Sequence, residues 1–311
     1  MSIDDFWTWW AGARDDVQTA IEARETDAAI LREVLDRVAA LDLVCEMSPG
    51  ITARHALCVS ANGDPAKRKR AYRWRDAAPP ADEIFEYHPA RVAGPGGPEM
   101  ILRLGGEAFA FSDLRFDVTV DAARHELDLE LQHPMFRGLD DQTRAQVGFI
   151  ALDNLLGEED VERWIGALRF SDKAPRAAVT PSDLQAEVER LRSATVADEW
   201  ALLSGDDVVA IAARPLRAVD HPYLDLLCEL KARPVDHDLS TLQDNERDLA
   251  EAFGERAFHA ASVTRGDTRT AFVYVDGDTS ASGELEDWAA ERGYETTFSL
   301  DPAWDAVRPF R

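Results

Sequence analysis

The chain has 311 residues, 45% of them hydrophobic, and this length favours two domains that bury their own cores without disulfides or a structural metal. Its 59 acidic and 34 basic side chains give a net charge of −25, and the acids are spread along the whole chain. Such a surface disfavours binding to nucleic-acid phosphates, whereas it suits a protein partner with a basic surface, or simply keeps the protein soluble.

Other general features predict a cytoplasmic protein without a membrane partner. The three cysteines, Cys45, Cys58 and Cys228, show neither metal-binding nor redox spacing, as is typical of a reducing compartment. The first residues include Asp4 and Asp5 but no basic segment, so a signal peptide is not expected. No apolar run reaches the roughly 18–20 residues of a membrane span.

The N-terminal segment has the pattern of an amphipathic helix. Ser2 and Asp5 fit a capping box at its start. The residues of its apolar stripe are Ile3, Phe6, Trp7, Trp10, Val17 and Ile21. Trp9 lies on the flank of this stripe, which leaves a second domain, a partner or solvent as its surroundings. A second helix is expected over 31–41.

The middle of the chain predicts strands that alternate with helices. A helix should begin at Pro65 after the cap Asp64 and end before Pro79. Residues 125–131 alternate strictly between polar and apolar, as in a strand with one wet face. Other strands are expected at 43–47, 55–61, 83–88, 99–104, 107–112 and 115–120, and a helical region broken at Gly157 over 141–170.

A linker and a polar helix are expected to separate two domains. Thr180, Pro181 and Asp183 form a strong helix start, and the helix that follows to about 194 is mostly polar, so we interpret it as a bridge. The predicted organisation is an N-terminal domain over 1–172, a linker with the bridging helix over 173–197, and a C-terminal domain over 198–311.

The last third predicts a second α+β unit. Its expected strands cover 199–203, 207–213, 224–231, 258–264, 270–276 and 294–300, and its expected helices cover 240–254 and 281–292. The fold class is therefore α+β, with mainly antiparallel sheets and packed helices. A ferredoxin-like arrangement is one candidate for the second domain.

Several short motifs of the last third point to a known family. They comprise Trp200, a polar turn at Gly205, Glu246, Asp248 and Leu249 on a helix, Thr264, Gly266 and Arg269 before Ala271–Tyr274, and Asp301–Trp304. With these motifs, residues 198–311 resemble the bacterial domain-of-unknown-function family 695. The first half looks like the region that accompanies such domains, through its Trp-rich start, Ser60–Gly63, Ala77–Pro79 and Leu152–Glu158.

The resemblance implies no established reaction. Domains of this kind also occur fused to a module that resembles an inhibitor of ribonuclease E, which points to regulation by protein contact. Within the shared motifs, the candidate binding residues are Arg269, Tyr274, Asp301 and Trp304. Arg269 is expected to pair with Asp301, and Tyr274 and Trp304 either line a groove or form an aromatic anchor that closes the fold.

The common catalytic motifs are missing from the sequence. The sequence has no His-Glu-x-x-His, nucleophile elbow or phosphate-binding loop, and no cofactor or metal site is predicted. Asp236-His237-Asp238 is the densest group of metal-capable side chains, but adjacent residues do not easily converge on one ion, so a solvated loop is favoured. Cys45 and Cys58 are either two buried thiols or a redox pair.

The basic run over 67–75, which includes Tyr72 and Trp74, has two interpretations. It is either a solvated or internally paired helix face, or a site for an anion or nucleic acid.

The leading functional prediction is a non-enzymatic protein that binds or regulates another protein. The alternative is a hydrolase whose site is assembled from scattered residues at the inter-domain cleft, since catalytic groups need only converge in space.

Overall fold

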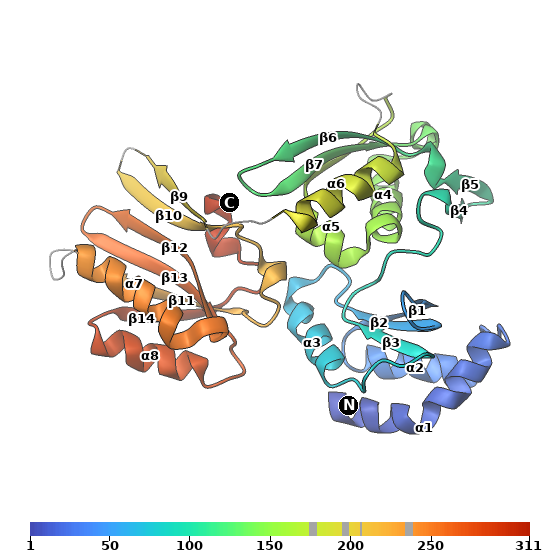
Figure 1. Cartoon of the computed structure of the whole chain (residues 1–311), viewed down its shortest axis with the longest axis horizontal. Helices are drawn as coiled ribbons and strands as arrows, with labels where there is room; N and C mark the ends of the chain where they lie inside the picture. Colours follow the sequence, from blue (N-terminus) through green and yellow to red (C-terminus); the bar gives the residue numbers. More distant parts are fainter. Residues whose placement is uncertain (174–178, 195–198, 206, 234–238) are drawn as a thin grey trace. The chain divides into compact units, whose positions relative to one another are not determined.

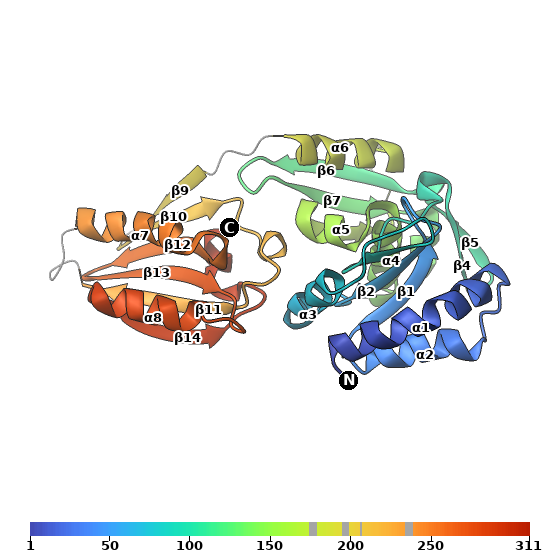
Figure 2. The ribbon, with the colours of Figure 1, turned by 60° about the horizontal axis from the view of Figure 1, so that its bottom comes forward.

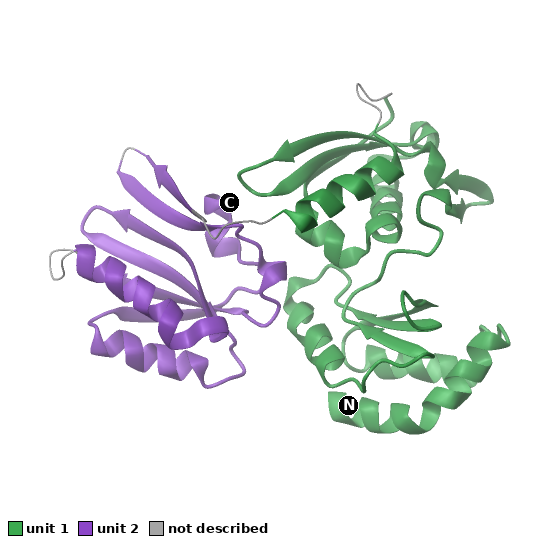
Figure 3. Cartoon of the chain, viewed as in Figure 1, with its two compact units in different colours: residues 1–194 green, residues 195–311 purple. Residues whose placement is uncertain are grey.

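The structure is a computed structural model, which describes residues 1–173, 179–194, 199–205, 207–233 and 239–311. The chain divides into two compact units, residues 1–194 and 195–311 (Figures 1 and 3). Helices and several mostly antiparallel sheets make up both, so the predicted α+β class is confirmed. Among the described residues, no helix is both long and apolar enough to cross a lipid bilayer.

The first lobe of unit 1 covers residues 1–88 and has its own core. Its elements are α1 (Ile3–Glu22), α2 (Ala29–Ala39), β1 (Val44–Pro49), β2 (His55–Ser60), α3 (Pro65–Asp76) and β3 (Phe85–His88). The strands form a sheet in the order β1-β2-β3, with β2 and β3 parallel. Helices α1 and α2 lie side by side (Figures 1 and 2). The predicted capping box of Ser2 and Asp5 is present.

The aromatic start of α1 supplies the centre of this core. Trp10 is 1% exposed, and its Nε1 donates to the Tyr87 hydroxyl at 3.0 Å. Trp7 Nε1 donates to the Trp74 carbonyl oxygen at 2.9 Å. The sequence did not decide what surrounds Trp9. In the structure it is partly buried beneath Arg37 of α2, and the guanidinium carbon lies 4.4 Å from the ring centroid. A cation–π contact within the same lobe therefore covers it.

The second lobe of unit 1, residues 97–193, surrounds a separate core. Its elements are β4 (Ile101–Leu104), β5 (Glu107–Ala110), β6 (Arg115–Asp121), β7 (Glu126–Gln132), α4 (Asp141–Leu156), α5 (Glu158–Trp164), β8 (Ile165–Ser171) and α6 (Pro181–Ser193). Strands β4 and β5 form a hairpin, and the sheet β6-β7-β8 pairs β8 parallel to β7.

Strand β8 corrects the expectation of a helix up to residue 170. The helical stretch ends at Trp164, and the chain continues extended beside β7, where Leu168 pairs with Leu129. Phe170 packs tightly on α4 at Gly148, where a Cβ atom would lie 2.1 Å from the ring. Tertiary packing on α4 thus stabilises a strand where the pattern suggested more helix.

Helix α6 was expected to bridge two domains, but it belongs to unit 1. Its Leu184 and Val188 are 0% and 2% exposed in the core of the second lobe. The helix is fixed on α4, α5 and β6 by three apolar residues, namely Leu184, Val188 and the partly buried Leu191.

Unit 2 has ferredoxin-like topology with an added hairpin. Its elements are β9 (Glu199–Ser204), β10 (Val208–Arg214), β11 (Leu226–Ala232), α7 (Leu239–Phe253), β12 (Ala257–Arg265), β13 (Thr268–Val275), α8 (Ala281–Glu291) and β14 (Glu295–Leu300). The antiparallel order β14-β11-β13-β12 with helices after β11 and β13 is the βαββαβ arrangement. Hairpin β9–β10 extends this sheet beyond β12.

The two faces of the six-stranded sheet are covered differently. Helices α7 and α8 lie on one face and contact β12, β11 and β14 (Figure 1). The opposite face packs on the segment around Leu216–Leu224 and on the C-terminal residues up to Phe310. On the helix side, hairpin β9–β10 extends beyond α7, and this leaves part of the sheet face open.

Candidate functional site

Arg269 lies buried in β13 and is held by helix α7. Its Nε and Nη2 donate to the two carboxylate oxygens of Glu246 at 2.7 Å each, and its Nη1 donates to the Thr264 hydroxyl at 3.0 Å. The expected pair of Arg269 with Asp301 is therefore wrong. Arg269 and Tyr274 lie at opposite ends of β13. Because they are an odd number of residues apart, their side chains point to opposite faces of the sheet. Asp301 lies beside Tyr274 and thus far from Arg269.

The other three predicted residues do come together. The Tyr274 hydroxyl donates to Asp301 Oδ2 at 2.7 Å, and the Trp304 ring stacks on Tyr274 with 4.3 Å between centroids. Trp304 Nε1 donates to the Leu224 carbonyl oxygen at 2.9 Å. Tyr274 and Trp304 are both 0% exposed. They therefore form an aromatic anchor for the C-terminal segment, as in the second of the two interpretations, and do not line a groove.

The basic helix α3 is largely paired within unit 1. Lys67 Nζ lies 2.7 Å from Asp42 Oδ1, Arg70 Nη1 lies 3.4 Å from Asp42 Oδ2, and Arg68 pairs with Glu162. These contacts favour the internally paired helix face over an anion site.

The cysteine geometry favours buried thiols over a redox pair. In the β1–β2 ladder Cys45 pairs with Val59, the neighbour of Cys58, so the two thiols point to opposite faces of the sheet. Burial raises the pKa of Cys45 to about 12 and that of Cys58 to about 11, which keeps both protonated at neutral pH.

The metal-capable segment Asp236–Asp238 falls outside the described residues. Within the described part of the chain, no group of three or more His, Cys, Asp or Glu side chains is placed to hold a metal ion.

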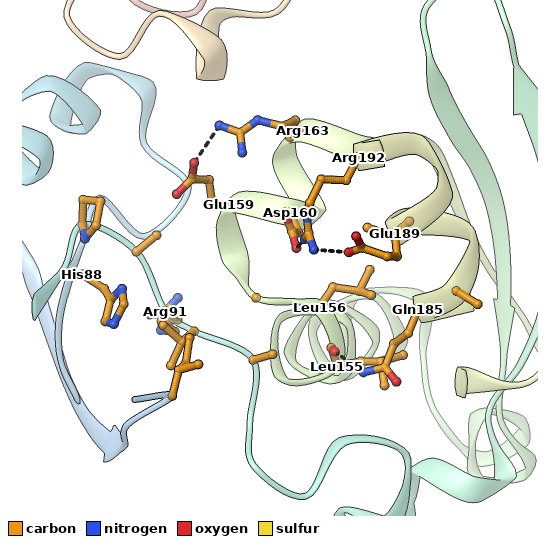
Figure 4. Close-up of a pocket in the computed structure, with 18 residues that line it drawn as sticks. His88, Arg91, Leu155, Leu156, Glu159, Asp160, Arg163, Gln185, Glu189 and Arg192 are labelled. Atoms are coloured by element: carbon orange, nitrogen blue, oxygen red, sulfur yellow. Dashed lines mark hydrogen bonds and ion pairs between the residues drawn. The ribbon is translucent and has the colours of Figure 1, made fainter. Parts of the chain in front are cut away.

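Unit 1 contains a cavity of about 670 Å³ between residues 88–93, α5 and α6 (Figure 4). Its charged side chains are paired with one another. Arg192 donates to Glu189 at 2.5 Å and also pairs with Asp160, and Arg163 donates to Glu159 at 2.6 Å. Because each of these guanidinium groups already has a carboxylate partner, the cavity offers no excess positive charge to an anionic ligand.

Next to this cavity, a polar cluster ties the two lobes of unit 1 together. The Ser60 hydroxyl donates to the carboxylate of Glu158 at 2.6 Å, and the Arg91 backbone N–H donates to the same carboxylate at 3.1 Å. Asp153 lies at the C-terminal end of α4, 3.9 Å from Arg91 Nη1. Burial raises the pKa of Asp153 to about 6, and the negative charge of Glu158 makes the second-largest contribution to this rise.

Asp153→Asn is expected to stabilise the protein at pH 7.5 by about 1–3 kcal/mol and to change little at pH 4. A folded-state pKa near 6 exceeds the ordinary 3.8, so the wild-type protein loses stability as the pH rises through this range. In Asp153→Asn this pH-dependent loss of stability is absent, because asparagine does not ionise. Urea unfolding at both pH values measures it, with the exposed Asp16→Asn as control. An equal gain at both pH values would contradict the assignment.

Unit 2 contains a second cavity, of about 700 Å³, between hairpin β9–β10 and the flank of α7. The hairpin contributes Trp200, Ile211 and Ala213, and α7 contributes Ala250. His259 of β12 also lines it, and its ring centroid lies 4.9 Å from that of Trp200. This volume is in the range of sites that bind drug-sized ligands or peptide side chains.

His259 has a serine partner, which bears on the hydrolase alternative. His259 Nε2 lies 2.8 Å from Ser262 Oγ, and a serine bonded to a histidine is the minimal pair for nucleophilic catalysis. Ser262 is 0% exposed and does not line the cavity. The hydroxyl is thus out of a substrate's reach, and we interpret the bond as fixing the orientation of the His259 ring.

The cavity continues into an open apolar surface on the hairpin. Trp200, Leu202 and Val209 are 47%, 70% and 48% exposed, and together with Ile211 they lie on one face of β9–β10. We call these four residues the hairpin face. Strand β9 pairs with β10 alone among the described strands, so its outer edge is open. Exposed apolar groups of this kind mark interaction sites in soluble proteins.

The edge of β9 has little of the usual protection against strand pairing. Apart from Glu199 at its start, its sequence contains no charged residue and no proline, and its register with β10 runs without a bulge. The Gly205 N–H donates to the Val208 carbonyl oxygen at 2.8 Å, and every second residue back along β9 bonds to β10 in the same way. The backbone groups of Trp200 and Leu202 therefore point towards the open edge.

Comparison of the chain with family models, with curated proteins and with solved structures finds no match. The resemblance to domain-of-unknown-function family 695 therefore stays a prediction.

The sequence indicated parts of this surface without identifying it. Trp200 and Glu246 were singled out only as members of a motif. The apolar composition of β9 and β10 indicated two strands, but it did not show which face would stay uncovered. His259 carried no sequence signal, since a lone histidine in a strand is usually structural.

Proposed function

We propose that the C-terminal unit is a protein-binding module, which pairs an extended segment of a basic partner protein with the open edge of β9. The exposed hairpin face beside this open edge is the observation that carries the proposal. In such strand addition the main chain provides affinity and alternate side chains provide specificity.

The geometry of the edge defines what the partner segment needs. Residues placed opposite Trp200 and Leu202 would direct their side chains to the same side as the hairpin face. Two apolar residues separated by one other residue would therefore extend this face.

The charge of the molecule favours a basic partner over a second copy of the chain. The net charge of −25 makes self-association electrostatically unfavourable. The exposed acids of this unit include Asp207 in the β9–β10 turn and Asp248 and Glu251 on α7. Lysine or arginine residues around the apolar pair would be attracted to these acids. A cytoplasmic location, as predicted from the sequence, is compatible with such a role.

Leu202→Lys is expected to weaken binding of a partner peptide at least tenfold, because it puts a charge into the apolar contact. The peptides are selected from a random library against the full chain and their affinity is measured by fluorescence anisotropy. Leu300→Lys is the matched control, since Leu300 is 75% exposed on β14, the other edge strand. It should retain affinity within twofold.

Equal losses in the two variants would argue against the β9 edge. N-methylation of successive peptide amides tests the pairing itself. Strand addition predicts that alternate methylations weaken binding, and a uniform tolerance would exclude it.

A further inference from the structure

We infer that the cavity between α7 and the hairpin receives a neutral aromatic side chain of the docked segment. The inference rests on the proposed function and adds the chemistry of one partner residue. Trp200 connects the two surfaces, because it belongs both to the hairpin face and to the wall of the cavity. A strand paired with β9 would thus pass the mouth of the cavity.

The walls of the cavity are rich in aromatic rings. Trp200 and His259 contribute two of these rings. Phe258 and His221 also line the cavity, and both of their rings already stack on Trp304. Rings of this kind stack favourably, edge to face or offset, with a further aromatic ring.

The carboxylates that line the cavity are already neutralised. Glu246 is held by Arg269 through two bonds of 2.7 Å, and Asp220 accepts from Arg217 Nε at 2.7 Å. A lysine or arginine side chain entering the cavity would lose its hydration without gaining an uncompensated carboxylate.

The arginine residues that line the cavity also take part in polar contacts, though weaker ones. Arg247 Nη1 lies 2.9 Å from Asp244, and Arg214 Nη1 donates to the Ala213 carbonyl oxygen at 3.2 Å. Burial lowers the pKa of both His221 and His259, so these rings are neutral at neutral pH. An acidic side chain would have to compete with Asp244 for the exposed Arg247 and with the Ala213 carbonyl oxygen for Arg214. A neutral ring needs no such exchange and is therefore the better fit.

The flank of α7 leaves room for such a ring. The residues that face the cavity from the later turns of this helix are Ala250 and, just after its end, Gly254. Ala250→Phe fills this space, whereas Ala252→Phe places the same side chain on an exposed position of the same helix that does not line the cavity. The two variants form a matched pair.

The first test measures the cavity with a small aromatic probe. 5-Fluoroindole, followed by ¹⁹F NMR, should bind the full chain with about millimolar affinity and be displaced by p-cresol. Ala250→Phe should weaken the binding of 5-fluoroindole at least fivefold. Ala252→Phe should keep the affinity within twofold of that of the unsubstituted chain. Displacement by n-butylamine or butyrate as effective as that by p-cresol would overturn the inference, as would equal affinity in the two variants.

The second test uses the library-selected peptides. They should share an aromatic residue, and Ala250→Phe should reduce their affinity about tenfold while Ala252→Phe does not. Selected peptides without an aromatic residue would refute the inference even if Leu202→Lys abolishes their binding. Conversely, probe binding that depends on Ala250, with peptides indifferent to Leu202→Lys, would refute the proposed strand addition alone.

Discussion

Glu246→Ala is expected to destabilise the C-terminal unit by about 3–5 kcal/mol, because it leaves the Arg269 guanidinium buried without its counter-charge. The two side chains are 6% and 5% exposed, and both carboxylate oxygens accept from Arg269. Hydrogen–deuterium exchange of α7, β12 and β13 at increasing urea concentrations measures the loss.

A double variant separates the cost of the lone charge from the value of the pair. Glu246→Leu combined with Arg269→Met should recover most of the lost stability, since apolar replacement of a whole buried pair is often neutral. If the double variant is no more stable than Glu246→Ala, the Glu246–Arg269 pair contributes more to stability than the mutual neutralisation of two buried charges.

Trp10→Ala should destabilise the first lobe by about 3–5 kcal/mol, whereas Trp9→Ala should cost about 1 kcal/mol. Trp10 is fully enclosed, stacks on Phe6 and donates to Tyr87, so its removal leaves a cavity and an altered hydrogen bond. Trp9 is only partly buried, and its removal loses the contact with Arg37 and the ring contacts with Phe6 and Trp10 at the edge of the core. Urea unfolding, monitored by circular dichroism, compares the two.

Arg37→Ala provides a control for the smaller effect. If the cation–π contact accounts for Trp9, Trp9→Ala should add little to the Arg37→Ala variant. Losses of equal size for Trp9→Ala and Trp10→Ala would contradict the difference in burial.

The elements of unit 2 were largely predictable because each has a strong local signal. The hairpin 257–275 has a two-residue turn with Gly266 at positive φ, a conformation that glycine adopts without strain. Strand β8 was missed for the opposite reason. Its extended form depends on pairing with β7 and on the close contact of Phe170 with Gly148, neither of which is visible in a local pattern.

The candidate site was less accessible to sequence reasoning, because it depends on what is left uncovered. Trp200 and Trp304 both belong to the quoted motifs, yet one is 47% exposed and the other 0%. Residue type alone does not separate an aromatic anchor from an aromatic contact surface. The partner of Arg269 was mistaken for the same kind of reason, since helix α7 and not the C-terminal turn lies over that end of β13.

The appended position of hairpin β9–β10 has a consequence for how this unit can change in evolution. Strands β11–β14 with α7 and α8 complete the ferredoxin-like arrangement by themselves. On the covered face of β10, Ala210 and Ala212 are constrained by packing at 2% and 0% exposure. Val209 and Ile211, on the opposite face of β10, are less constrained by core packing. Substitutions at these two positions are therefore expected to change partner preference without disturbing the ferredoxin-like scaffold.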